Sequence, residues 1–415
     1  MRKLKKRWMR RFVLVMTTVL ATGNILCGCS RQEMIRTISL PDTEDKDMGI
    51  SGFVIKNIQE YTYEGQSEDH LQLAWGKAGE NTVCQLRYEE EGYIYREIDI
   101  HTKKTIRKEF MDERMAFNMQ IAPGGKFISY EAETEEKVGP ELVVFLAEEG
   151  EHMVLRKWDE CLQGFSYVWS DDGNRLFSWQ NGDNYAFQPD TDWCVTCYDM
   201  KTVKRDSDGK WMVEKTEFQM KGSNYAQRHI LPNADGSRVY VREEYDSFSD
   251  SKNQEYPGKD EAAEEKMMRA KNWLLIPEEQ KKKKVSEYSK ETVWPVKYTK
   301  KGLYYQNEEG MLLLAENVED KPSVKELFRA SNMEIAICGN GDHIFHVEWI
   351  DDMQNMQISG VKLEGTQPTA KQVLYKDSCE GVEFYVSADD SAIVLRGYEY
   401  PGDDRCSFKI MKLGY

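Results

Sequence analysis

The sequence predicts an all-β fold made of repeated units of four short strands. Two observations predict it. A tight polar turn followed by an alternating apolar strand recurs along the chain, and a second apolar strand follows each of these turns. The chain of 415 residues can bury a large core, and its 22 Tyr and 10 Trp are typical of a folded protein.

Each turn is a small or polar stretch, usually with Gly at its centre, where the absence of a Cβ permits positive φ. The seven copies are GKAGENTVCQ (76–85), APGGKFISYE (122–131), SDDGNRLFSW (170–179), NADGSRVYVR (233–242), TKKGLYYQNE (299–308), CGNGDHIFHV (338–347) and SADDSAIVLR (387–396). They recur about every 50 residues, a period that falls in the range of β-propeller blades.

The second half of each unit repeats as well. Its apolar strands are YIYREIDIHTKK (93–104), ELVVFLAEEGE (141–151), WCVTCYDMKTVK (193–204), NWLLIPEEQKK (272–282), GMLLLAENVE (310–319), MQISGVKLEG (356–365) and CSFKIMKLG (406–414). Several of them end in a charged turn and a short fourth strand, which completes a four-stranded blade. The seven copies predict a seven-bladed β-propeller over residues 50–415, with six or eight blades as alternatives. Stacked β-sandwiches or an open β-solenoid are the other architectures considered.

The turn-plus-strand units resemble the repeats of TolB-type and related WD-like β-propellers, whose core pattern is small-Pro-Asp-Gly-x-x-Ile-x-Tyr. The resemblance covers most of residues 50–415. Only the copy at 122–131 keeps the Pro, and only the copies at 170–179 and 233–242 keep Asp-Gly.

The ends of the repeat region predict how the ring closes. The last unit ends after its third strand, so GFVIKNIQEYTYEG (52–65) is expected to supply the missing strand and to remove an open sheet edge. An insertion at 246–271 explains the long spacing of the fourth unit, and the helix-forming composition of its second half predicts a short helix.

The N-terminus has the features of a targeting segment. Seven Lys/Arg lie within the first eleven residues, and a short apolar stretch follows to about Leu26. Leu26-Cys27-Gly28-Cys29 resembles the lipobox of bacterial lipoproteins, which implies cleavage after Gly28 and a lipid on Cys29. Cys27 fits this pattern less well, because Asn24 would take the aliphatic position. An uncleaved signal anchor is the alternative. We expect a signal peptide at 1–28 and an acidic flexible tether at 29–49.

The charge of the mature chain restricts its partners. Removal of the seven basic residues leaves 49 Lys/Arg against 72 Asp/Glu, a net charge of −23. Nucleic acid is excluded as a partner on this basis, because its binding requires basic surfaces. The lipid anchor predicts attachment to the extracytoplasmic face of the cell membrane.

The chemical motifs of the chain favour structural roles. Cys194 and Cys197 lie in a predicted strand, where positions three apart face opposite ways, so a redox pair is not expected. In GDHIFHVEW (341–349), His346 and Glu348 share one face and His343 lies on the other, which is too few ligands for a metal site. The run KKKK (281–284) is expected in an exposed connecting turn. No nucleophile elbow, Walker loop or dinucleotide fingerprint occurs.

Asp171 and Asp172 are adjacent carboxylates in the turn of the third repeat. Because this turn recurs, the two side chains are expected to shape a hairpin, with Leu176 and Phe177 facing opposite ways along the next strand. The sequence therefore predicts no catalytic, cofactor or metal residues. It predicts a noncatalytic, lipid-anchored binding or scaffolding module with an envelope protein as partner. The alternatives are a glycan or peptide ligand, or a propeller hydrolase or lyase acting on polysaccharide.

Overall fold

The protein is described from a computed structural model. The described residues are 34–38, 54–64, 73–75, 82–89, 92–99, 105–112, 116–132, 140–157, 165–180, 191–222, 226–245, 270–285, 293–330, 335–351, 355–378, 381–386, 392–398 and 405–414. The predicted signal peptide and Cys29 lie outside them. Within them, no helix has the length and apolar character needed to cross a membrane.

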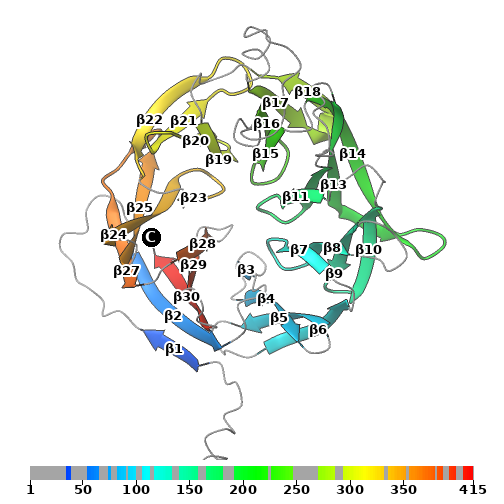
Figure 1. Ribbon diagram of the computed structural model, residues 1–415, viewed down its shortest axis with the longest axis horizontal. Helices are drawn as coiled ribbons and strands as arrows, with labels where there is room; N and C mark the ends of the chain where they lie inside the picture. The colour runs from blue at the N-terminus through cyan, green and yellow to red at the C-terminus, as the bar shows by residue number, and fades with distance from the viewer. Residues whose placement is uncertain are drawn as a thin grey trace, which may run out of the picture.

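Seven antiparallel sheets stand around a central axis, each with its first strand nearest the centre and its fourth at the rim (Figure 1). Blade 1 contains β3 (Leu73–Trp75), β4 (Thr82–Glu89), β5 (Gly92–Asp99) and β6 (Thr105–Asp112). Blade 2 contains β7 (Ala116–Ile121), β8 (Phe127–Ala132), β9 (Glu141–Leu146) and β10 (Glu151–Arg156). Blade 3 contains β11 (Phe165–Trp169), β12 (Arg175–Gln180), β13 (Thr191–Arg205) and β14 (Trp211–Gly222).

The next three sheets continue in chain order. Blade 4 contains β15 (Ala226–Pro232), β16 (Val239–Tyr245), β17 (Lys271–Ile276) and β18 (Lys281–Lys284), with the 3-10 turn η1 (Pro277–Glu279) between the last two. Blade 5 contains β19 (Val293–Thr299), β20 (Gly302–Asn307), β21 (Met311–Glu316) and β22 (Ser323–Arg329). Blade 6 contains β23 (Ile335–Ile337), β24 (His343–Asp351), β25 (Asn355–Glu364), β26 (Gln367–Pro368) and β27 (Gln372–Ser378).

Blade 7 closes the ring with strands from both ends of the chain. It contains β28 (Gly381–Val386), β29 (Ala392–Tyr398) and β30 (Arg405–Gly414), and β2 (Val54–Glu64) pairs with β30 as its fourth strand. The predicted closing strand and the predicted number of blades are both confirmed. A fifth strand, β1 (Met34–Ile38), pairs with β2, so this part of the predicted tether is not free chain.

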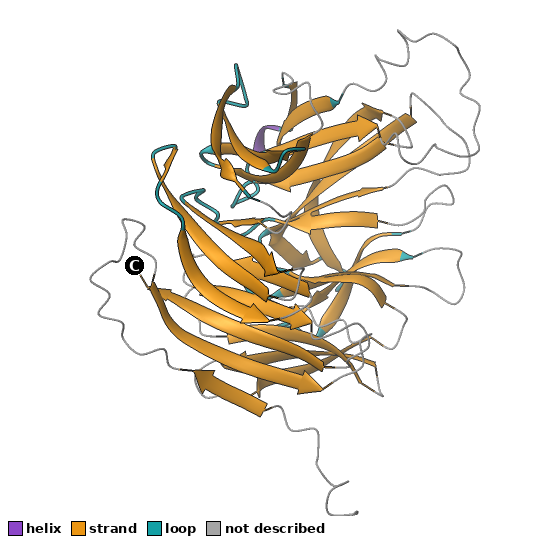
Figure 2. Ribbon diagram, turned by 60° about the vertical axis from the view of Figure 1, so that its left-hand side comes forward, coloured by secondary structure: helices purple, strands orange, loops and turns teal. Residues whose placement is uncertain are grey.

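The core lies between neighbouring blades rather than inside one layer. Strand alternation builds it: Leu176 packs toward blade 2, and Phe177 packs toward blade 4. The prediction that these two side chains face opposite ways is confirmed. The sheets of neighbouring blades stack face to face, and their strands are drawn in orange in Figure 2. Trp169, Trp193 and Trp273 are buried in these interfaces.

Two of the predictions from the sequence concern blade 4. The short helix predicted in 246–271 falls almost entirely outside the described residues, and its last position, Lys271, begins β17. The run 281–284 was expected in a turn, and this is wrong: it forms β18, the rim strand of blade 4. All four lysines are exposed there, because a rim strand has no neighbour on its outer side.

Candidate functional site at the centre of the ring

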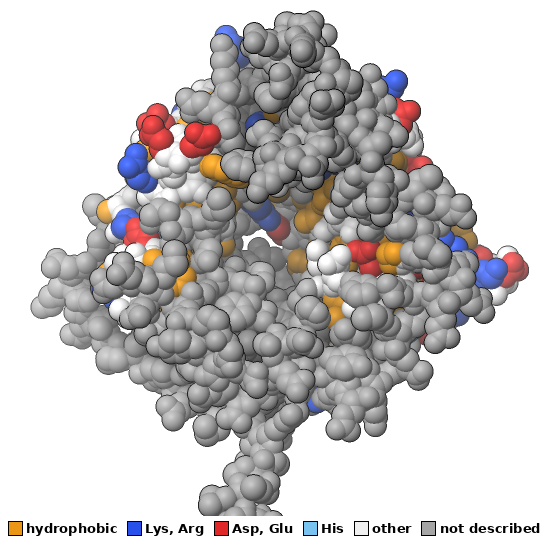
Figure 3. All heavy atoms as spheres, viewed as in Figure 1, with side chains coloured by type: hydrophobic (Ala, Val, Ile, Leu, Met, Phe, Trp, Pro, Cys, Tyr) orange, Lys and Arg blue, Asp and Glu red, His pale blue; other side chains and the backbone are white. Residues whose placement is uncertain are grey.

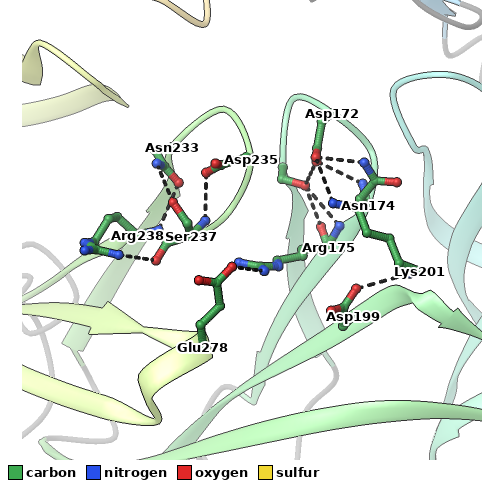
Figure 4. A network of polar contacts seen from close by, with 11 residues as sticks. Asp172, Asn174, Arg175, Asp199, Lys201, Asn233, Asp235, Ser237, Arg238 and Glu278 are labelled. Atoms are coloured by element: carbon green, nitrogen blue, oxygen red, sulfur yellow. Dashed lines mark hydrogen bonds and ion pairs between the residues drawn. The ribbon is translucent and has the colours of Figure 1, made fainter.

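In blades 2 to 6, the turns that join the first and second strands lie on one face of the ring, which we call the hairpin face. In blade 3 the turn is closed by two backbone hydrogen bonds, Ser170 N to Arg175 O (2.9 Å) and Gly173 N to Ser170 O (2.9 Å). The Asp172 carboxylate accepts the Ser170 hydroxyl (2.6 Å) and the Asn174 backbone amide (3.1 Å) (Figure 4). Asp172 therefore shapes the hairpin, as predicted.

This turn also locks against its two neighbours. Gly173 has a φ of +67°, and a Cβ on it would lie 1.9 Å from the carbonyl oxygen of Pro123 in the blade 2 turn. On its other side, the Asp172 backbone amide donates to Ala234 O of the blade 4 turn (3.0 Å). The turns of blades 2, 3 and 4 therefore form a continuous layer of backbone on the hairpin face.

Asp171 does not shape the turn, so the prediction is wrong for this carboxylate. Its Oδ1 atom forms an ion pair and hydrogen bond with Lys297 on β19 of blade 5. Its Oδ2 atom is buried without a hydrogen-bond partner among the described residues, and it lies 3.3 Å from the position of a Cβ on Gly339 in the blade 6 turn. Both side chains of the pair are about one-quarter exposed (24%). Asp171 thus reaches across the centre of the ring.

The hairpin face is therefore constricted where blades 3 to 6 converge. The same position on Gly339 lies 3.3 Å from the Cβ of Ala234, so the turns of blades 4 and 6 also meet. In the space-filling view, basic and acidic side chains lie side by side in the central hollow (Figure 3). Lys297 and Asp171 neutralise each other, so the described part of this centre carries an internal ion pair.

Charged side chains also connect neighbouring blades at the hairpin face. Arg175 on β12 donates to Glu278 in η1 of blade 4 (2.9 Å) (Figure 4). One blade further, Arg238 donates to Glu319 of blade 5 (3.1 Å). Both arginines stand two residues after the turn glycine of their repeat, so the same kind of Arg–Glu ion pair joins two successive pairs of blades.

A second group of charges is buried between blades 3 and 4, away from these turns. The guanidinium of Arg228 lies over the Trp193 ring, 4.4 Å from its centroid, and its Nε atom is 3.5 Å from Glu243. Lys271 approaches the same carboxylate at 3.8 Å. This group was not predicted from the sequence. The alternation of Arg228 with buried Ile230 on β15 was the available signal that this arginine faces the core.

The cysteines of WCVTC lie as predicted. Cys194 is half-buried, Cys197 is buried between blades 3 and 4, and both are free thiols. Burial raises the pKa of both thiols, that of Cys197 to about 12, so their reactive thiolate forms are disfavoured.

The side chains of GDHIFHVEW also fall on the predicted faces. His346 Nδ1 lies 4.0 Å from Glu348 Oε1, and Lys371 donates to that carboxylate (2.5 Å). Burial lowers the pKa of both His343 and His346, and His346 is the more completely buried of the two. In the part of the chain that the structure describes, no group of three or more His, Cys, Asp or Glu side chains could hold a metal.

Seven antiparallel sheets of four or five strands stand around one axis, and a strand from the opposite end of the chain closes the ring. This arrangement decides the fold. The protein is a seven-bladed β-propeller. No family model matches the chain, and no curated protein does. Its resemblance to TolB-type repeats and its lipoprotein character stay predictions.

Solved structures share the fold of this propeller. An oligogalacturonate lyase in complex with manganese has 10% identity and a TM-score of 0.54, over 92% of this chain and 96% of that one. The oligogalacturonate lyase of Vibrio parahaemolyticus has 11% identity and a TM-score of 0.56, over 92% and 97%. A structure from a study of two prolyl endopeptidases has 10% identity and a TM-score of 0.51, over 79% of this chain but only 45% of that one. At these identities the likeness concerns the fold alone.

Proposed function

We propose that this propeller is a lipid-anchored, extracytoplasmic module that binds or scaffolds another envelope protein without catalysis. The observation that carries the proposal is the way charges are used at the hairpin face. Asp171 with Lys297, Arg175 with Glu278 and Arg238 with Glu319 are one-to-one ion pairs between different blades. Such pairs fix the blades relative to one another, whereas a catalytic centre needs groups held in protonation states suited to proton transfer.

Two sequence features support the location. The lipobox-like Leu26-Cys27-Gly28-Cys29 provides an acceptor cysteine, and the mature net charge of −23 suits a body that stays solvated beside an anionic bilayer. A rigid ring with many exposed loops and rim strands suits recognition of a protein surface. A glycan or a peptide is the less favoured ligand.

The anchor is tested by fractionating cells that express the wild type or Cys29→Ser. We expect the wild type in the membrane fraction and the variant in the soluble fraction, because the variant cannot carry a thioether-linked lipid. A Cys29→Ser protein that still partitions with membranes would overturn the anchor. Cys27→Ser is the matched control, and it should remain membrane-bound.

Scaffolding is tested by crosslinking in intact cells followed by affinity recovery of the wild type. We expect the same envelope protein in repeated experiments, and we expect that protein, when tagged, to recover the propeller in return. Repeated failure to recover a reciprocal partner would count against scaffolding. Incubation with oligogalacturonate tests the enzymatic alternative that the lyases suggest: formation of unsaturated products would replace this proposal with a catalytic one.

A further inference from the structure

Strand β1 lies within the segment that separates Cys29 from the rest of the ring. It pairs with β2 over five residues, from Met34 opposite Thr62 to Ile38 opposite Ile58, and β2 pairs in turn with β30. The closing blade therefore holds the chain from Met34 onward. Only residues 30–33 remain between Cys29 and the first held residue.

This short connection limits how far the ring can move from an anchor on Cys29. Five steps between Cα atoms span at most about 18 Å. A compact domain of this length has a radius of gyration of about 21 Å, which corresponds to a body about 50 Å across. The connection is therefore much shorter than the ring is wide, and blade 7 must stay near the anchored end.

The most basic strand of the propeller lies on the other side of the ring. β18 carries Lys281–Lys284, all exposed, and we call it the lysine edge. In a ring of seven, blades 3 and 4 are the farthest from blade 7, and β18 and β1 stand on opposite sides in Figure 1. Lys281 pairs with Glu279 (2.6 Å) and Lys283 with Asp320 (3.1 Å), so Lys282 and Lys284 are left to draw this edge toward anionic lipid, at about 1 kcal/mol for each lysine near the surface.

We propose that β1 holds the rim of blade 7 against the bilayer and keeps the lysine edge turned away from it. The proposal rests on the lipid anchor at Cys29. Without the pairing of β1, residues 30–53 would form a connection of up to about 85 Å, long enough for the ring to turn over. β1 thus decides which rim meets the membrane, and it leaves the lysine edge facing the aqueous side.

The pairing also gives the direction in which the chain leaves the blade. Met34 lies opposite Thr62, and Thr62 lies opposite Ser407 near the start of β30. β30 begins at the end of the blade remote from the turn before β29, so the chain leaves on the side away from the hairpin face. The anchor is therefore attached at the corner of blade 7 where its rim meets the face opposite the hairpin face.

Energy transfer in vesicles tests the orientation with the full-length lipidated protein. The vesicles contain anionic lipid and a headgroup-attached acceptor. A thiol-reactive donor is placed on Lys283→Cys of the lysine edge or on Arg405→Cys of blade 7. Both variants are made in a background in which serine replaces every cysteine after Cys29 except the buried Cys197 and Cys338. We expect at least fivefold more transfer from position 405 than from position 283. Equal transfer from both positions would overturn the proposal.

Two further variants ask whether β1 sets this orientation. Insertion of 20 Gly/Ser residues between Glu33 and Met34 lengthens the connection and leaves the fold unchanged. We expect transfer from position 283 to rise at least threefold, and to fall again at 0.5 M salt as the lysines are screened. Ile35→Pro/Thr37→Pro, which removes two backbone donors from β1, should give the same rise, and Ile35→Ala/Thr37→Ala should give a smaller one.

The readouts separate this inference from the anchor itself. If the wild-type protein fails to remain with the vesicles, the lipid anchor fails. If it remains bound but transfer from position 283 does not change with the insertion, the anchor stands and the orienting role of β1 is wrong.

Discussion

The interface between blades 3 and 4 and the interface between blades 5 and 6 each carry an ion pair at the hairpin face, but the first buries an arginine in its core and the second buries an imidazole. In the first, Arg175 bonds Glu278 across the boundary, and Arg228 lies over Trp193. In the second, Lys301 pairs with Asp342 (2.5 Å), and the Tyr304 hydroxyl donates to Gly341 O (2.8 Å). His346 is fully buried there beside the Phe328 ring.

At both interfaces, a left-handed glycine at the centre of the turn fits against the preceding blade. Gly236 has a φ of +67° and fits against Arg175 and Phe177 of the preceding blade, and Gly341 has a φ of +80° and fits against Thr299 and Tyr304. Both interfaces also bury apolar side chains from the two facing sheets. The comparison indicates that the left-handed glycine and the apolar stack define the blade boundary, whereas the buried polar group differs from one boundary to the other.

The largest loss of stability is expected when a methyl group is added to the turn glycine of blade 6. In Gly341→Ala, the new Cβ would lie 2.7 Å from Thr299 Oγ1 and 3.1 Å from the Tyr304 hydroxyl, both at buried residues. Left-handed strain costs about 1–2 kcal/mol, and the steric clash costs about 1–3 kcal/mol more. We expect the free energy of unfolding, measured by urea titration, to fall by about 2–4 kcal/mol.

The matched variant is Gly236→Ala in the turn of blade 4. Its Cβ would lie 2.9 Å from Arg175 Cδ, and this side chain can shift because it is long and flexible. The strain at positive φ is the same, so we expect a smaller loss, of about 1–3 kcal/mol. If neither variant lowers stability by as much as 1 kcal/mol, the turn glycines do not define the boundary.

Much of the architecture follows from short-range features of the sequence. Turn residues and strand alternation are local features, so the repeats predicted the blades. The recurrence of the turn at 170–175 likewise predicted that Asp172 shapes a hairpin. Asp171 has the same local setting, yet its partner Lys297 is 126 positions away and is brought near only by closure of the ring. Arg228 over Trp193 is equally non-local. The run 281–284 was misassigned because lysine composition indicates exposure and does not distinguish a rim strand from a turn.

The imidazole of blade 6 predicts that acid affects one interface more than the other. Burial lowers the pKa of His346, and the nearby Glu348 carboxylate offsets this only in part. Because the folded pKa lies below the unfolded value of about 6.5, the unfolded chain binds the proton more readily. The stabilising contribution of neutral His346 is therefore present above pH 6.5 and is lost as the pH falls.

His346→Leu isolates this effect. Both ring nitrogens of His346 lack hydrogen-bond partners among the described residues, so leucine should leave stability at pH 7.5 unchanged or slightly higher. Between pH 6.5 and 5 we expect wild type to lose about 1 kcal/mol more than the variant. Glu348 keeps its charge in this range because, against the effect of burial, hydrogen bonds from Lys371 and Gln357 lower its pKa. His343→Leu is the control: burial also lowers the pKa of His343, but this imidazole is only half-buried and lies on the other face of the strand, so its rescue should be smaller. A rescue equal to that of His346→Leu would remove the assignment to the interface of blades 5 and 6.

The smallest effect on the free energy of unfolding is expected from Glu278→Gln, at the interface between blades 3 and 4. The Glu278 side chain is 65% exposed although Arg175 is buried, so water already screens much of their attraction. Glutamine can still accept the guanidinium hydrogen bond. We therefore expect a loss of no more than about 1 kcal/mol in urea unfolding, and a smaller difference from wild type at 0.5 M salt. A loss as large as that of Gly341→Ala would mean that the ion pair, rather than the turn glycine and the apolar stack, holds blades 3 and 4 together.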